Sequence, residues 1–407
     1  MQLTIDRLSL HADGVARGPE GTLHVAMALP GEVIEGEPVE GRIAAPKIVT
    51  PSADRVKAPC AHYRACGGCA LQHASDAFVA RWKAEVVETA LAGRGITARV
   101  ARVETSPLQA RRRATLAGRR TKKGTLVGFH ARGSETLIEV PNCLILRPEL
   151  LAVVPALHEA TEAGASRKGE VAFALTLSEA GVEIATRGGK PVDPALFATL
   201  AALAERHDLA RLSWEGETIA ARRPALQNFG RARVTPPPGA FLQATEAGEA
   251  ALVDFVRAAT EGAAKVADLF AGCGTFALAL ADRAEVHAVE AEAAMLGALD
   301  RGWRAAQGLK RVTHEARDLF RRPLLPDELE AHDAIVIDPP RAGAEAQVAE
   351  ICTSKTRHLA YVSCNPVTFA RDAAALTAAG FALEELIVVD QFRWSPHIEL
   401  AARFRRG

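Results

Sequence analysis

The chain has 407 residues, of which 48% are hydrophobic and 24% charged, with 49 basic and 49 acidic side chains. This composition excludes an intrinsically disordered chain and predicts two or three folded domains. It contains no apolar run of about 18 residues and no secretory signal, so we expect a cytoplasmic protein with no membrane partner. Seven cysteines favour thiols, metal ligands or catalysis over a disulfide framework. No feature indicates self-association, and we expect a monomer.

The N-terminal half contains two segments of different character. Residues 1–58 alternate apolar and polar side chains in short runs separated by Gly and Pro, which predicts a small antiparallel β-barrel of about five strands. Residues 59–235 combine a cysteine cluster, a helix around Asp76 to Ala92 and strand-like stretches. We expect this segment to form a central α+β domain.

A proline-rich segment, TPPPG at 235–239, can neither continue a helix nor pair as a central strand. Beyond it, short apolar strands (KVADLFA, EVHAVE, DAIVIDPP and HLAYVSC) alternate with Ala-rich helical stretches. This pattern predicts βαβ units around a parallel sheet. Residues 236–407 are therefore expected to form a doubly wound, Rossmann-like α/β domain.

Positive charge is concentrated in one part of the chain. Between Arg94 and Arg132 there are eleven Lys or Arg residues and one acidic residue, Glu104. Such a stretch can neutralise phosphates, which predicts contact with nucleic acid, although a solvated basic face is the alternative.

A glycine loop follows the first strand of the C-terminal domain. Gly272 and Gly274 stand where the strand turns into a helix, which lets a ligand approach the backbone. A plain tight turn fits this loop about as well, but Glu290 ends the next strand, where an acidic side chain commonly binds ribose hydroxyls. Two glycines instead of three favour a nucleoside without a pyrophosphate, and S-adenosylmethionine fits this description.

Two further acidic residues follow predicted strands, at the edge where ligands bind in such sheets. Asp318 comes after the third strand, and it could equally be a helix N-cap. Asp338 ends the very apolar strand DAIVID before a stiff Pro-Pro turn, which favours a place in the ligand crevice.

One cysteine occupies a comparable place. Cys364 follows the strand HLAYVS and precedes a helix, whose N-terminus is expected to lower the pKa of the thiol. Cys273 and Cys352 are expected to be inert apolar side chains. A thiolate suits a methyltransferase that acts on carbon 5 of uracil, because addition to carbon 6 makes carbon 5 nucleophilic. Glu399 is our candidate for the base that removes the carbon-5 proton, with a surface carboxylate as the alternative.

Four cysteines form a second constellation. Cys60, Cys66 and Cys69 have the spacing Cys-x5-Cys-x2-Cys, and Cys143 lies far downstream. Four thiolates suit either zinc or an iron–sulfur cluster, and the spacing alone does not separate the two.

Five motifs, FLQAT, DLFAGCGTF, DPPR, SCNPVTFARD and SPHIE, occur in this order, and with them the chain resembles the RNA 5-methyluridine methyltransferase family. The resemblance implies a class I methyltransferase domain, preceded by a TRAM-like, OB-like RNA-binding barrel. It implies that Cys364 is the nucleophile and Glu399 the base. It also implies that a set of side chains contacts the cofactor or the target base: Gln243, Phe270, Gly272, Thr275, Glu290, Asp318 and Asp338.

The cysteine spacing is similar to that of the ribosomal RNA branch of this family, which implies a [4Fe-4S] cluster on Cys60, Cys66, Cys69 and Cys143. Several positions depart from the family pattern. Thr275 stands where many members have Asn, Asp318 where some have Asn, and Thr245 where the motif that begins at Phe241 ends in Asn, and residues 393–396 replace a Phe-Pro segment. The expected function is methylation of a flipped-out or single-stranded uridine in 23S ribosomal RNA. The alternatives are a transfer RNA uracil-5-methyltransferase and a non-catalytic iron–sulfur RNA-binding protein.

Overall fold

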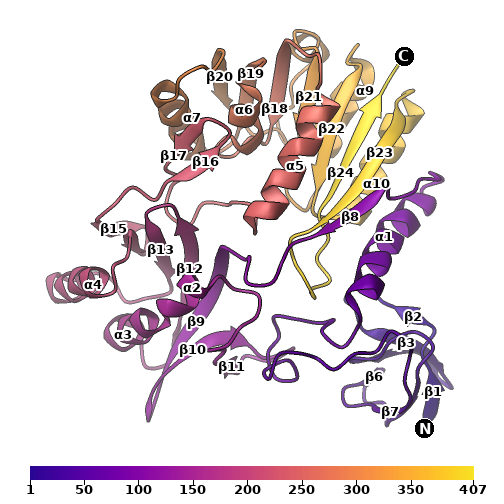
Figure 1. The fold of residues 1–407 in the computed structure, drawn as a ribbon, viewed down its shortest axis with the longest axis vertical. Helices are drawn as coiled ribbons and strands as arrows, with labels where there is room; N and C mark the ends of the chain where they lie inside the picture. Colours follow the sequence, from indigo (N-terminus) through magenta and orange to yellow (C-terminus); the bar gives the residue numbers. More distant parts are fainter.

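The computed structural model describes residues 1–407, which form three groups of strands (Figure 1). The N-terminal strands lie at the lower right of Figure 1, the central sheet at the lower left and the C-terminal sheet at the top. None of the helices has both the length and the apolar character needed to cross a membrane.

The N-terminal segment folds into two small sheets around one apolar core, which includes Ile5, Val25 and Ile34. The sheets have the strand orders β1-β5-β7 and β2-β3-β4-β6. The strands are β1 (Gln2–Thr4), β2 (Arg7–Leu8), β3 (Gly14–Gly18), β4 (Gly21–Val25), β5 (Val33–Glu35), β6 (Arg42–Ile43) and β7 (Lys47–Thr50). The expected single antiparallel barrel is not confirmed. Strand β5 joins the other sheet, so the chain crosses over between β4 and β6 and these two strands pair in parallel.

The central sheet has seven strands in the order β11-β10-β9-β12-β13-β14-β15. They are β9 (Arg113–Thr121), β10 (Gly124–His130), β11 (Leu137–Ile138), β12 (Glu170–Ser178), β13 (Gly181–Arg187), β14 (Arg211–Trp214) and β15 (Glu217–Ala221). Three helices, α2 (Pro148–Ala152), α3 (Val154–Gly164) and α4 (Pro194–Arg206), pack on this sheet around a shared core. A hairpin of β16 (Gln227–Phe229) and β17 (Ala232–Val234) leads to the C-terminal part.

The C-terminal sheet has eight strands in the order β20-β19-β18-β21-β22-β24-β23-β8. They are β8 (Arg102–Thr105), β18 (Lys265–Leu269), β19 (Glu285–Glu290), β20 (Val312–Ala316), β21 (Ala334–Ile337), β22 (His358–Ser363), β23 (Ala382–Asp390) and β24 (Leu400–Arg405). All four residues of β21 are buried, as expected for a strand covered on both faces. The expected parallel sheet is corrected to a mixed one. The short connection between β23 and β24 makes β24 antiparallel to both of its neighbours.

Helices cover both faces of this sheet. One face packs against α5 (Glu246–Ala259), α6 (Thr275–Leu280) and α7 (Ala293–Ala305). The other packs against α1 (Asp76–Ala92), α8 (Pro326–Leu329), α9 (Glu345–Thr353) and α10 (Pro366–Ala378). The result is a three-layer α/β domain.

Two elements from the expected central segment belong to this layer structure instead. Strand β8 pairs in parallel with β23, and the apolar face of α1, with Val87 and Leu91, packs in the same core as α10. In Figure 1, α1 and β8 lie beside the C-terminal sheet. The expected segment 59–235 is therefore not one packing unit, because its first helix and strand bury their apolar side chains against the C-terminal domain.

Candidate active site

The functional side chains gather where the parallel strands of the C-terminal sheet end. Leu269 of β18 pairs with Ile337 of β21, so Asp338 follows at the end of the sheet that also carries the glycine loop. Cys364 directly follows β22, whose last residue, Ser363, pairs with Leu400. Glu399 immediately precedes Leu400, so the antiparallel register places Cys364 and Glu399 opposite each other. Sequence spacing predicted the strand ends correctly, but it did not predict this pairing.

The glycine loop has the backbone of a tight ligand-binding turn. Phe270, Gly272 and Gly274 all have positive φ angles, 62°, 54° and 92°. A Cβ atom at residue 274 would lie 2.8 Å from a methyl group of Leu299, so glycine is required there. Thr275 is the first residue of α6. The loop therefore turns directly over the end of β18.

Glu290, the last residue of β19, lies beside this loop. Its carboxylate accepts a hydrogen bond from the backbone N–H of Gly272 at 3.0 Å and another from Glu292 at 3.0 Å. These contacts hold the carboxylate at the mouth of the turn. The expected association of Glu290 with the glycine loop is found.

Asp268 is a carboxylate of this region that the sequence interpretation did not single out. It is fully buried on β18, and one of its oxygens accepts a hydrogen bond from the N–H of Ala277 at 2.8 Å, while the other has no partner. Burial, together with the nearby Asp338 and Glu290, raises the pKa of Asp268 to about 8. An acidic residue in an apolar strand directly before a glycine loop is a sequence signal that could have identified Asp268.

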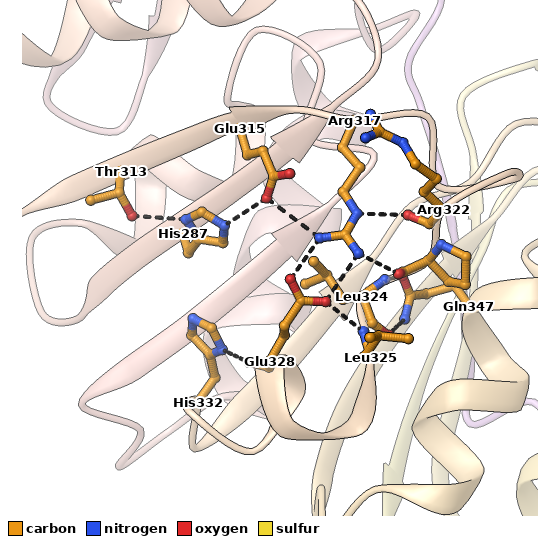
Figure 2. Close-up of polar contacts among 11 residues, drawn as sticks. His287, Thr313, Glu315, Arg317, Arg322, Leu324, Leu325, Glu328, His332 and Gln347 are labelled. Atoms are coloured by element: carbon orange, nitrogen blue, oxygen red, sulfur yellow. Dashed lines mark hydrogen bonds and ion pairs between the residues drawn. The ribbon is translucent and has the colours of Figure 1, made fainter.

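A rigid loop, residues 317–325, carries Asp318. Figure 2 shows that the guanidinium of Arg317 donates to Glu328 at 2.7 Å and to the carbonyl of Arg322 at 2.7 Å. At the end of the loop, the buried Gln347 makes two hydrogen bonds to the backbone of Leu324 (Figure 2). The loop is therefore fixed from two sides.

The fixed loop presents an aromatic side chain toward the glycine turn. The rings of Phe320 and Phe270 have centroids 5.5 Å apart, and Phe320 is 47% exposed. Asp318 accepts a hydrogen bond from the N–H of Phe320 at 3.0 Å and does not cap a helix. Exposed aromatic rings and a carboxylate beside a glycine turn form a surface suited to a nucleoside.

Asp338, Glu399 and Cys364 form an acidic group with a thiol. Burial raises the pKa of Asp338 to about 7 and, together with the charge of Asp338, raises the pKa of Glu399 well above its usual range. Glu399 is 3% exposed, so the alternative of a surface carboxylate is excluded. The raised pKa makes the ionised form of Glu399 a stronger base than an exposed carboxylate, which suits it to accept a proton.

The expected lowering of the Cys364 pKa by the helix N-terminus is wrong for the ligand-free protein. Burial raises the pKa of the thiol to about 11, and Glu399 and Asp338 add to the rise because they disfavour a further negative charge. Arg341 acts in the opposite direction with less effect. Cys273, buried against Met295, has a pKa raised to about 12, as suits an inert thiol.

Two glutamines connect the acidic residues. Gln243, 3% exposed, accepts a hydrogen bond from the amide nitrogen of Gln391 at 2.6 Å, and its own amide nitrogen lies 3.5 Å from Asp338. The same nitrogen of Gln391 lies 3.5 Å from Glu399. Gln391 directly follows β23 and was missed in the sequence, because its role depends on a partner 148 positions away.

The prediction that the basic stretch between Arg94 and Arg132 contacts nucleic acid is corrected in part. Arg112 is 4% exposed and binds Glu249 of α5 at 2.6 Å and the carbonyl of Gln243 at 3.2 Å. Arg113 donates to the carbonyl of Leu242 at 2.8 Å. These arginines hold the segment that carries Gln243, since a buried guanidinium needs acceptors inside the protein. Arg112 is therefore not available to phosphates.

The four-cysteine set (Cys60, Cys66, Cys69 and Cys143) lines one cavity of about 1200 Å³. All four thiols are unpaired and partly buried. Burial and the other three cysteines raise the pKa of Cys69 to about 12. No three side chains lie close enough together to hold a single metal ion. The structure therefore brings the expected ligands to one cavity without forming a compact single-ion site.

Comparisons with known proteins identify relatives of this chain. Residues 304–406 match the family model for tRNA (uracil-5-)-methyltransferase. An uncharacterized RNA methyltransferase of Brucella suis biovar 1 is 44% identical over 406 residues, covering 100% of this chain and 98% of that protein. The 23S rRNA (uracil(1939)-C(5))-methyltransferase RlmD of Chromohalobacter salexigens is 34% identical over 430 residues, covering 98% of this chain and 87% of its own.

A solved structure gives the same fold. The Pyrococcus abyssi tRNA (uracil-54, C5)-methyltransferase, in complex with S-adenosyl-L-homocysteine, has a TM-score of 0.77 at 22% identity and covers 99% of both chains. The fold is therefore that of a methyltransferase. With the relatives above, the chain belongs to the RNA uracil-5-methyltransferase family. The expected family and enzyme class are confirmed.

Proposed function

We propose that this enzyme uses S-adenosylmethionine to methylate carbon 5 of one uridine in 23S ribosomal RNA. The observation that carries the proposal is the register that sets the thiol of Cys364 opposite the buried carboxylate of Glu399. The ribosomal RNA substrate is supported by the 34% identity to an enzyme named for 23S ribosomal RNA.

The cofactor site is assigned to the side chains around the glycine turn. In this proposal Glu290 binds the ribose hydroxyls, Phe270 and Asp318 contact the adenine, and the ligand approaches the backbone of Gly272 and Thr275. Support comes from the position of these residues around one turn. Asp338 faces the reacting end. Bound S-adenosylmethionine supplies an electrophilic methyl group on a positively charged sulfur.

The protein's own residues perform the remaining steps. The Cys364 thiol, which is partly exposed, gives up its proton to water to form the thiolate, and the positive charge of the cofactor would lower the pKa of this thiol. The thiolate adds to carbon 6 of uracil, and the electron pair of the 5,6 double bond becomes available at carbon 5. This pair would bond to the methyl carbon of the cofactor, whose sulfur would keep the electron pair of the broken bond and leave as a neutral thioether. Glu399 then removes the carbon-5 proton, the double bond returns and the thiolate leaves.

The RNA is proposed to enter through the cavity beside the site. Its walls come from the N-terminal sheets, the cysteine segment, the central sheet and the loop before Glu399, and they include five arginines, Arg42, Arg64, Arg111, Arg132 and Arg393. Arg42 pairs with the acidic wall residue Asp13, and Arg393 pairs with Asp76, which leaves Arg64, Arg111 and Arg132 without a carboxylate partner. Arginines in a cleft of this kind bind phosphates, and the target uridine has to leave a stacked helix to reach Cys364.

The four-cysteine set is proposed to hold a [4Fe-4S] cluster. The donors fit because four unpaired thiols from two distant segments line one cavity, and because their mutual repulsion needs a cationic group to form thiolates. Each cysteine of such a cluster binds a different iron, so the ligands need not converge on one ion as at zinc. Anaerobically purified protein should contain iron and labile sulfide, and zinc without iron would reject this assignment.

The substrate is tested by methylation of transcripts in vitro. Purified enzyme with radiolabelled cofactor is given 23S ribosomal RNA or transfer RNA lacking modifications, and digests are analysed for 5-methyluridine. Label at one ribosomal uridine supports the proposal, whereas label in transfer RNA alone supports the alternative substrate. Label in neither RNA, with no adduct to 5-fluorouridine RNA, supports the non-catalytic alternative.

A further inference from the structure

We propose that Gln391 determines uracil specificity, because it fixes which end of the Gln243 amide faces the target base. The inference rests on the proposed function and concerns a residue that need not touch the RNA. It makes Gln391 a positioning residue for recognition of the base.

The orientation of Gln391 follows from a backbone contact. Its side-chain oxygen accepts a hydrogen bond from the N–H of Ala244 at 2.8 Å. A backbone N–H only donates, so the atom facing it has to be the amide oxygen. The amide nitrogen of Gln391 is therefore turned toward Gln243 and Glu399.

The orientation of Gln243 follows in turn. Because the nitrogen of Gln391 only donates, the atom that it meets at 2.6 Å has to be the oxygen of Gln243. The amide nitrogen of Gln243 then points away, toward the carboxylate of Asp338 at 3.5 Å. It carries two hydrogens, and Asp338 accepts at most one of them from this nitrogen.

The amide nitrogen of Gln243 is therefore a hydrogen-bond donor next to an acceptor, the carboxylate of Asp338, at the reacting end of the site. Asp338 is half-buried and is linked to Glu399 through Gln243 and Gln391. The strand register sets Cys364 opposite Glu399, so these groups lie in one region. Uracil presents the complementary pair, an accepting oxygen on carbon 4 beside the donating N3–H. Cytosine presents the reverse pair, an amino group beside an unprotonated nitrogen, and meets like groups at both positions. Carbon 4 is bonded to carbon 5, so the side chain that recognises the oxygen on carbon 4 has to lie near the reacting residues, as Gln243 does.

The test compares RNA binding in a background that cannot form the covalent bond. Cys364→Ala protein is given a short synthetic RNA that carries uridine or cytidine at the position that the wild-type enzyme methylates, and Kd is measured for both. In Cys364→Ala/Gln391→Met the amide of Gln243 can rotate, and the uridine preference should fall about tenfold, which is the loss of one oriented hydrogen bond. The control Gln227→Met removes another buried glutamine, which binds the carbonyl of Leu177, and should leave the preference unchanged.

An unchanged preference in the Gln391→Met protein overturns the inference. If that variant fails to bind S-adenosylhomocysteine and is therefore misfolded, RNA carrying 2-pyrimidinone, which lacks both the oxygen on carbon 4 and the N3–H, is bound to Cys364→Ala alone. Binding at least about tenfold weaker than to uridine RNA supports the inference, and equal binding overturns it. A wild-type protein that methylates no uridine overturns the proposed function itself, a result distinct from either outcome.

Discussion

The ammonium of Lys83 lies 2.6 Å from a carboxylate oxygen of Asp390, and both side chains are almost completely buried. Lys83 also donates to the carbonyls of Phe392 at 3.2 Å and His397 at 2.9 Å. One lysine on α1 therefore fixes both ends of the loop that connects Gln391 to Glu399. This contact joins the N-terminal half of the chain to the catalytic base.

Removal of this lysine should destabilise the protein strongly. Lys83→Met leaves Asp390 buried without a partner charge, so the free energy of unfolding should fall by about 3 kcal/mol or more. Urea unfolding measures the change. The double variant Lys83→Met/Asp390→Asn removes both charges and should recover most of the loss, and a double variant as unstable as the sum of the single variants would contradict this account.

Replacement of the base should trap the reaction intermediate. Glu399→Gln keeps the size of the side chain but cannot remove the carbon-5 proton, so the bond between Cys364 and carbon 6 persists. A protein–RNA adduct stable to denaturing electrophoresis should accumulate on ordinary uridine RNA. The matched variant Cys364→Ala should give no adduct, and rapid turnover by Glu399→Gln would show that another group is the base.

The reactivity of Cys364 should depend steeply on pH. With a pKa of about 11, the thiolate fraction rises tenfold for each pH unit below that value. Alkylation of Cys364 by iodoacetamide, followed by mass spectrometry of its peptide, should therefore accelerate about 100-fold between pH 7 and pH 9. S-adenosylmethionine should accelerate alkylation at pH 8 relative to S-adenosylhomocysteine, which lacks the sulfonium charge. A plateau above pH 7 would contradict the raised pKa.

Ionisation of the buried Asp268 carboxyl group should lower the stability of the folded protein at high pH. Its pKa is about 8 in the folded protein against the ordinary value of 3.8, so the unfolded chain ionises first and stability falls as pH rises from about 4 to about 8. Asp268→Asn can still accept from the N–H of Ala277 and should raise Tm by roughly 2 to 4 °C at pH 8 for each kcal/mol recovered. At pH 4 the gain should be much smaller, and an equal gain at both values would disprove the shift.

The strand ends were predictable from the sequence because the βαβ pattern places them at one edge of the sheet. Asp338 and Cys364 could be assigned in this way, and Glu399 came from the family resemblance. The contact between Gln391 and Gln243 could not be predicted. The orientation of the Gln391 amide depends on the backbone N–H of Ala244, which only the fold brings near.

Two of the predictions made from the sequence were wrong for the same physical reason. Arg112 looked like a phosphate ligand, and α1 with β8 looked like part of the central domain, because local sequence carries charge and periodicity but not the identity of a distant partner. Arg112 instead meets Glu249, and β8 pairs with β23. Both contacts join residues more than 100 positions apart.

The most direct test of the central claim is mass-spectrometric mapping of 5-methyluridine in ribosomal and transfer RNA from cells with and without the gene. Our account predicts that one 23S ribosomal uridine loses its methyl group, that the wild-type gene restores it and that Cys364→Ala does not. Full restoration by Cys364→Ala, or an unchanged 23S pattern in cells without the gene, would contradict it.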